Sequence, residues 1–322
     1  MPDLTVIVPV FNEALALDVF HGRLIDVIER LSLQTVVIYV NDGSTDETRQ
    51  VLDEIAKADP RVSALELSRN FGHQAALSAG LARAQGKLVV MMDGDGQHPP
   101  ELIFEMIRLQ SLGYDIVQCQ RLDATSSASF MKRVTARLFY ALLRNIGEID
   151  LPPGSADFRL ITDEVLEVLR SLPECHRFIR GMISWVGFRS ILLPYRPEDR
   201  IGGRTKYSIK KMLRLAGDGV FSFSLVPLRL GLLVGSTFFL LGVAEIIYVL
   251  TFWIAGQQRS LVPGWSSIIV LVTLATACIM VVLGFIGIYV GMIFQEVKRR
   301  PVFIVRNTPS SSGRTSEEGG SK

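Results

Sequence analysis

The sequence predicts an α/β fold in which a mostly parallel sheet carries helices on both faces, followed by a hairpin of two transmembrane helices. Two observations lead to this prediction. Short apolar runs rich in β-branched residues alternate with longer segments of helical periodicity through the first 120 residues, as in a parallel sheet built from strand–helix units. Two apolar stretches in the last third, residues 230–254 and 265–294, each exceed the ~20 residues that cross a bilayer.

Strands and helices are expected in alternation along the N-terminal part. The strands are the apolar runs at residues 4–10, 36–40, 62–67, 87–92 and 115–120. The helices are expected over residues 14–31, after an N-cap at Ser44 or Thr45, and over residues 75–84 and 99–112. Two prolines open the last of these helices, where a missing backbone donor costs nothing.

Two aspartates one residue apart, Asp93 and Asp95, follow the fourth predicted strand. Side chains at i and i+2 of an extended chain point the same way, so both carboxylates face one target. Gly94 and Gly96 let the backbone turn and a ligand approach closely. Adjacent carboxylates repel unless a cation lies beside them, and Mg²⁺ or Mn²⁺ bound also by substrate phosphates suits this pattern. An acidic turn that caps the next helix is the alternative interpretation.

Four of the predicted strands end in polar loops, at residues 11–13, 41–44, 69–73 and 93–95. Ligands of parallel α/β sheets bind outside the carboxyl ends of the strands, so these loops are expected to form one site. The sequence contains neither of the two common glycine-rich phosphate-binding motifs. Metal and basic side chains are therefore expected to hold the phosphates of a ligand.

Three motifs in this region resemble family 2 of the inverting glycosyltransferases, which have the GT-A fold: VPVFNE at residues 8–13, NDGSTD at 41–46 and DGDGQHP at 93–99. The resemblance implies a nucleotide-diphosphate-sugar donor. It implies a donor site formed by Pro9, Val10, Phe11, Glu13, Asp42, Ser44, Asn70, His73, Asp93 and Asp95. It also implies that Asp93, Asp95 and Gln97 hold the metal.

Asp157 directly precedes a short predicted strand. In the family an acid at this place lies beside the anomeric carbon and the acceptor, so the resemblance makes Asp157 the catalytic candidate. A phosphate monoester has its second pKa near ~6 and is already largely dianionic at neutral pH. We therefore expect Asp157 to orient the acceptor or the sugar, or to take a residual proton, rather than to be indispensable as a base. A loop aspartate paired with Arg159 is the alternative interpretation.

Basic side chains are concentrated in two segments. Residues 126–145 have the pattern of a basic amphipathic helix, and residues 196–211 are the basic peak of the chain. Guanidinium and ammonium groups suit a phosphate clamp, whereas juxtamembrane positive charge is the simpler interpretation of the same residues. The residues expected to bind the acceptor phosphate are Arg121, Arg133, Arg200 and Lys206.

Charge around the apolar stretches predicts the orientation in the membrane. Arg229 precedes the first stretch, Lys298, Arg299 and Arg300 follow the second, and the connecting loop holds only Arg259. The positive-inside rule then places both termini and the catalytic domain in the cytoplasm, with the protein as a multi-pass component of the inner membrane. Glycines four residues apart in both stretches favour close helix packing, within the hairpin or in a homo-oligomer.

The expected domains are a catalytic domain at residues 1–200, a basic juxtamembrane segment at 201–228, two spans within 229–297, and a tail at 298–322 whose end is disordered. The N-terminus lacks the pattern of a signal peptide. The net charge of +2 gives no case for nucleic acid as a partner, and three distant cysteines fit a reducing compartment.

The combination resembles the bacterial polyprenyl-phosphate glycosyltransferases over residues 1–300 and, in the soluble part, the dolichol-phosphate mannose synthases. It implies inverting, metal-dependent transfer of glucose from UDP-glucose to undecaprenyl phosphate at the cytoplasmic membrane face, as in O-antigen modification of lipopolysaccharide. A donor such as GDP-mannose or UDP-amino-arabinose is one alternative. The others are a processive polysaccharide synthase, for which two spans are too few, and a non-catalytic nucleotide-binding membrane partner.

Overall fold

The computed structural model describes residues 1–122, 154–174, 177–198, 226–255 and 264–306. Within these ranges the chain forms two compact units. The first contains all the strands, the helices that pack on them and the residues after 300, and the second contains two long helices. The predicted residues Arg133, Arg200 and Lys206 lie outside the described ranges, as does the predicted basic amphipathic helix.

A seven-stranded sheet forms the centre of the first unit, in the order β3-β2-β1-β4-β6-β5-β7. Its strands are β1 (Leu4–Val10), β2 (Thr35–Asn41), β3 (Val62–Glu66), β4 (Leu88–Met91), β5 (Ile116–Arg121), β6 (Ser155–Thr162) and β7 (Ser190–Tyr195). Strands β1 to β4 are parallel, and β7 is parallel to β5. Among the strands that the structure describes, only β6 runs antiparallel to its neighbours, β4 and β5. The predicted α/β class and mostly parallel sheet are confirmed.

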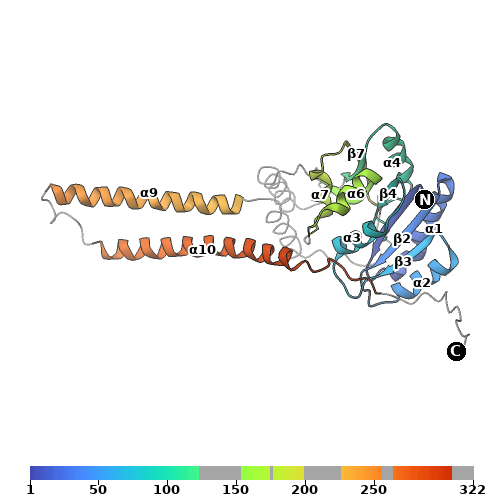
Figure 1. The fold of residues 1–322 in the computed structure, drawn as a ribbon, viewed down its shortest axis with the longest axis horizontal. Coiled ribbons are helices and arrows are strands. Elements are labelled where there is room, and N and C mark those ends of the chain that lie inside the picture. The colour runs from blue at the N-terminus through green and yellow to red at the C-terminus, as the bar shows by residue number, and fades with distance from the viewer. Residues whose placement is uncertain (123–153, 175–176, 199–225, 256–263, 307–322) are drawn as a thin grey trace, which may run out of the picture. The chain divides into compact units, whose positions relative to one another are not determined.

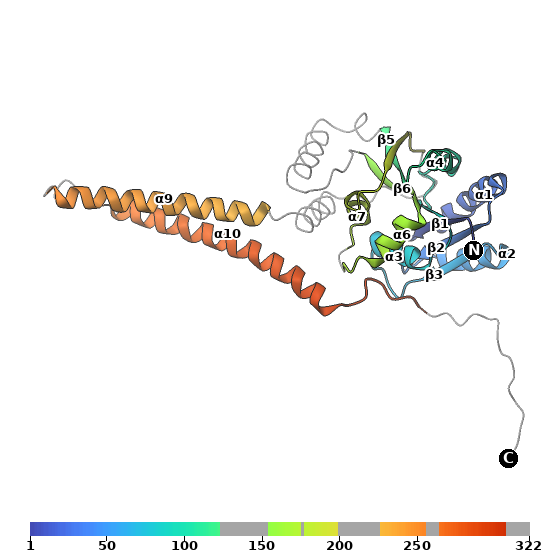
Figure 2. The ribbon, with the colours of Figure 1, turned by 45° about the horizontal axis from the view of Figure 1, so that its top comes forward.

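Helices cover both faces of this sheet (Figures 1 and 2). They are α1 (Ala14–Leu31), α2 (Thr48–Ala58), α3 (His73–Arg83), α4 (Leu102–Ser111), α6 (Asp163–Ser171) and α7 (Ile179–Trp185). Alternation along β1 directs Val6 and Val8 to the core shared with α1, α2 and α4, and Ile7 to the core shared with α3, α6 and α7. The centre of the sheet is therefore buried on both sides, which explains why β1, β2 and β4 are almost continuously apolar.

Helix α3 lies unusually close to β1. A Cβ atom built on Gly80 would lie 2.3 Å from Cγ2 of Ile7, so only glycine fits at this contact. Helix α3 begins at His73, shortly after the carboxyl end of the parallel strand β3, so its N-terminus lies at the carboxyl edge of the sheet.

The second unit consists of α9 (Val226–Ile254) and α10 (Trp265–Lys298), which contact each other. Among the described residues, one helical stretch, Leu274–Lys298, is long and apolar enough to cross a membrane, and Leu233–Ala244 is a shorter apolar stretch. Helices therefore lie where the hairpin was predicted, but only one of them meets the criterion for a span. Gly231 approaches Val282, with 3.1 Å from a built Cβ to Cγ2.

Candidate active site

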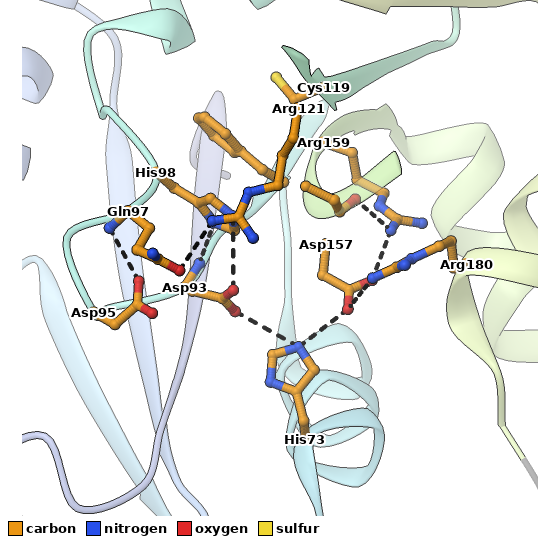
Figure 3. Close-up of polar contacts among 12 residues, drawn as sticks. His73, Asp93, Asp95, Gln97, His98, Cys119, Arg121, Asp157, Arg159 and Arg180 are labelled. Atoms are coloured by element: carbon orange, nitrogen blue, oxygen red, sulfur yellow. Dashed lines mark hydrogen bonds and ion pairs between the residues drawn. The ribbon is translucent and has the colours of Figure 1, made fainter. Parts of the chain in front are cut away.

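The acids that follow β4 and the acid of β6 meet at the carboxyl edge of the sheet. Met91, the last residue of β4, pairs with Arg159 in the antiparallel β6. Asp157 lies two residues before Arg159, and Asp93 two residues after Met91, so the register brings the two aspartates to the same level. His73 connects them: its Nε2 lies 3.6 Å from Oδ1 of Asp93 and 3.4 Å from Oδ2 of Asp157 (Figure 3).

A buried histidine fixes the turn after β4. The backbone amide of Asp93 donates to Nδ1 of His98 over 2.9 Å, and the amide of Gln97 donates to Oδ1 of Asp95 over 3.0 Å. The His98 ring is 2% exposed and stacks on Phe158, with ring centroids 4.9 Å apart. Burial lowers the pKa of His98, which favours the neutral ring that Nδ1 needs in order to accept. The conformation of the two-aspartate turn therefore depends on His98.

Asp157 is almost enclosed by positive and hydrogen-bonding side chains. Its Oδ1 accepts from Nη2 of Arg159 over 2.8 Å, and Arg180 donates to both carboxylate oxygens, over 3.3 Å from Nε and 2.8 Å from Nη2. Gln74 donates to Oδ2 over 3.4 Å. Burial alone would raise the pKa of Asp157, but Arg180, His73 and Arg159 hold it well below its usual range. The carboxylate is therefore ionised at any physiological pH.

His73 is the cation between the two acids. Desolvation at the site would lower its pKa, but the charges of Asp93 and Asp157 outweigh it and raise the pKa of His73 to about 9. Its side chain is 41% exposed, so it lies at the open side of the site. The sequence predicted His73 as a donor-site residue, and the structure brings it together with Asp93.

Asp42 holds the loop that leads to His73. Its buried carboxylate accepts from the backbone amides of Phe71, over 2.8 Å, and Gly72, over 2.9 Å. Burial raises the pKa of Asp42 although both amide bonds oppose that shift. Gly43, at φ +65°, brings the same loop close, because a Cβ there would lie 2.4 Å from the carbonyl carbon of Arg69. In this structure Asp42 thus positions a loop of the site.

The loop after β1 is tied to the loop after β2. The amide of Asn12 donates to Oγ of Ser44 over 3.0 Å, and the amide of Thr45 donates to Oδ1 of Asn12 over 2.8 Å. Phe11 is 40% exposed next to this junction, and Glu13 is partly buried.

Two further predicted donor-site residues belong to β1 and are buried. Val10 belongs to the hydrophobic core and Pro9 is buried in the strand, because both lie inside β1 rather than in the loop. Asn70, also predicted to bind the sugar donor, is exposed and therefore accessible to a ligand.

Arg121, at the end of β5, reaches the two-aspartate turn. Its Nη2 donates to the amide oxygen of Gln97 over 2.9 Å. The side-chain amide oxygen of Gln97, which was predicted to bind the metal, thus accepts a hydrogen bond from the guanidinium of Arg121. The described residues contain no group of three or more His, Cys, Asp or Glu side chains placed to bind a metal ion. Asp93 and Asp95 still fit Mg²⁺ or Mn²⁺, because Mg²⁺ is commonly held by one or two carboxylates with substrate phosphates and water.

A model of the Glycosyl transferase family 2 matches residues 5–170, the part of the chain that supplies all of these loops. The chain belongs to this family. Three relatives align with 94–95% of this chain. The "Uncharacterized glycosyltransferase YkcC" of Bacillus subtilis (strain 168) is 40% identical, and the alignment covers 93% of that protein. The "Uncharacterized glycosyltransferase sll0501" of Synechocystis sp. is 37% identical and 94% covered. The "SfII prophage-derived bactoprenol glucosyl transferase" of Shigella flexneri is 36% identical and 98% covered.

As a glycosyltransferase, the protein must hold an anionic donor and stabilise its leaving group. The site places two acids, Asp93 and Asp95, at the same edge as three basic side chains, His73, Arg121 and Arg180. Neither Arg180 nor His98 was among the site residues predicted from the sequence. The one available signal for Arg180 was a single charge in the otherwise apolar helix IRGMISW.

Proposed function

We propose that this glycosyltransferase transfers a sugar, glucose from UDP-glucose, to a polyprenyl phosphate, undecaprenyl phosphate, with inversion at the anomeric carbon. The observation that carries the proposal is the meeting of Asp157 with Asp93 at one edge of the sheet, joined by His73. The acceptor is supported by the bactoprenol glucosyl transferase, which is 36% identical to this chain over 309 residues.

Asp93 and Asp95 would hold Mg²⁺ or Mn²⁺. When bound, the ion supplies positive charge that neutralises the leaving nucleoside diphosphate. Phe11, Glu13, Ser44 and Asn70 surround the same strand ends and would contact the base and ribose. Gln97 would take part indirectly, because its amide oxygen already accepts from Arg121.

Asp157 would act by orientation rather than by accepting a proton. Its carboxylate is held ionised by Arg159, Arg180 and His73, and a group with so low a pKa is a weak base at neutral pH. The acceptor phosphate is itself a dianion and attacks without losing a proton. Asp157 thus keeps Arg180 and His73 directed at the reaction centre, where their charges stabilise the phosphate groups of donor and acceptor.

Arg121 would contribute to binding of the acceptor phosphate, together with Arg133, Arg200 and Lys206, which lie outside the described residues. The apolar helices would anchor the catalytic domain, residues 1–200, at the inner membrane, with both termini in the cytoplasm. Leu274–Lys298 supports one span, and a second span through α9 rests on the apolar stretch at residues 230–254. Contact between Gly231 and Val282 supports close packing within the hairpin. A homo-oligomer through these helices belongs to the same proposal.

Transfer of radiolabelled sugar tests the proposal. Purified full-length protein in detergent receives labelled UDP-glucose, undecaprenyl phosphate and Mg²⁺ or Mn²⁺, beside an Asp95→Ala variant. The expected result is chloroform-soluble label that disappears with EDTA and in the variant. Label only from GDP-mannose or UDP-amino-arabinose would change the sugar. A long polymer would favour a polysaccharide synthase, and nucleotide binding without transfer from any donor would refute the enzymatic proposal.

A further inference from the structure

The described residues that follow α10 return to the edge of the sheet. Val305 forms an isolated antiparallel bridge with Leu67, directly after β3. The amide of Arg306 donates to the carbonyl of Glu66 over 2.7 Å, and the amide of Ser68 donates to the carbonyl of Ile304 over 2.8 Å. In Figures 1 and 2 this segment runs beside β3. Residues 303–306, called here the C-terminal strap, thus pair with the only β3 edge that β2 leaves open.

Side chains reinforce this pairing. Phe303 and Val305 pack against the same hydrophobic cluster as Leu67. The guanidinium of Arg306 lies 3.2 Å from the carboxylate of Glu66, which also pairs with Arg49 at 3.0 Å. Backbone bonds, apolar contact and an ion pair therefore all hold four residues that lie about 240 positions away from their partners.

The strap contacts the chain where the loop to His73 begins. Ser68, which donates to the strap, is the first residue of the loop 68–72. The other end of that loop is held by Asp42, whose carboxylate accepts from Phe71 and Gly72. The loop has no regular structure of its own and is largely exposed, so its order depends on these two attachments together with the close approach of Gly43 to Arg69.

We propose that the C-terminal strap is a positioning element of the active site: by fixing Ser68 it holds the loop 68–72, and through it His73, between Asp93 and Asp157. The catalytic domain is therefore completed by residues that follow the last membrane-associated helix. An edge cover with no effect on the site is the competing explanation, because exposed sheet edges are commonly protected. The two explanations differ in what happens to the loop and to turnover when the strap is detached.

Substitution at Arg306 separates the backbone from the side chain. In full-length protein in detergent, Arg306→Pro removes the amide that donates to Glu66, whereas Arg306→Ala keeps that amide and removes only the ion pair. Hydrogen exchange of the peptide covering residues 66–74 is measured together with kcat and the donor KM. Arg306→Pro should accelerate exchange at Ser68, Phe71 and Gly72 and lower kcat about tenfold or more, since small displacements of catalytic groups are costly. Arg306→Ala should remain near the wild type.

Truncation gives a second, independent pair of variants. A chain that ends at Asn307 keeps the strap and should behave as the wild type, whereas one that ends at Val302 should resemble Arg306→Pro. Unchanged exchange in the loop, or faster exchange with normal kcat in the folded fraction, would overturn the proposal and leave an edge cover. The kcat measurement rests on the proposed function, whereas the hydrogen-exchange measurement does not. An inactive wild type with a strap-dependent loop would refute the proposed reaction alone.

Discussion

Asp157→Asn removes the charge that three cations share. The carboxylate is 10% exposed and lies 2.8 Å from both Arg159, which is 1% exposed, and Arg180. Removing one partner of a buried ion pair costs roughly 3–5 kcal/mol. Asparagine keeps one acceptor oxygen, so we expect a loss near the lower limit, about 3 kcal/mol, in the free energy of unfolding. A domain of ordinary stability, about 5–15 kcal/mol, remains folded after such a loss.

Turnover should fall strongly even though the protein remains folded. Without its carboxylate partner, Arg180 has no bidentate acceptor and no longer points at the reaction centre, so we expect about a hundredfold loss of kcat, equivalent to ~2.7 kcal/mol. Because the pKa of Asp157 lies well below its usual range, the wild-type carboxylate does not titrate between pH 6 and 9. Asp157→Asn also removes one of the two charges that raise the pKa of His73, so that pKa should fall and the loss of turnover should be largest at the high-pH end of the interval.

The assay is a pH–rate profile of sugar transfer for both proteins, with the folded fraction measured in parallel. Asp163→Asn is a suitable control, because Asp163 is an exposed acid in the first turn of α6, outside the site. Near-normal turnover of Asp157→Asn at high pH, with loss only at low pH, would refute orientation as the role and restore a proton-accepting aspartate.

Three further predictions concern the fold around the site. Gly80→Ala should destabilise the protein by about 1–3 kcal/mol, because the added methyl group meets Ile7. Gly22→Ala is the matched control: no atom lies within 4 Å of its added methyl group, so it should stabilise the protein by about 0.5–1 kcal/mol. Thermal unfolding of both variants measures the difference. His98→Ala removes the acceptor that fixes the turn after β4, so nucleotide-sugar binding by calorimetry should weaken at least tenfold. Burial lowers the pKa of His21 in the folded protein, so protonation of this histidine favours the unfolded state. The stability that the neutral ring contributes is fully present above pH 6.5 and is lost as the pH falls through the lowered pKa. His21→Gln should therefore reduce the pH dependence of the free energy of unfolding measured between pH 5 and 8.

Strands β1 to β5 could be predicted because they are short, mostly apolar and followed by polar turns, whereas β7 was not predicted. The position of Asp93 and Asp95 also followed from the sequence, since spacing of two residues after a buried strand directs both side chains alike. Local rules fail where partners come from distant segments. Nothing near Asp157 in the sequence indicates that β6 runs antiparallel to β4, and this direction alone brings Asp157 level with Asp93.

Other features depend on burial, which a single sequence does not display. The resemblance implied that Asp42 contacts the donor, and the sequence does not display that its carboxylate also accepts from the amides of Phe71 and Gly72. His98 gains its role from a ring stack with Phe158, 60 positions away by sequence number. The strap was predicted as part of a tail, since four residues give too weak a pattern to indicate a strand.

The structure and anomeric configuration of the lipid product test the central claim most directly. UDP-glucose, which carries an α-linked sugar, and undecaprenyl phosphate are incubated with the full-length protein, and the extracted lipid is analysed by mass spectrometry and NMR. The account predicts one hexose on the lipid phosphate in the β configuration, as single displacement at the Asp93–Asp157 site requires. An α-linked product, a sugar chain on the lipid, or unmodified lipid beside free glucose would contradict it.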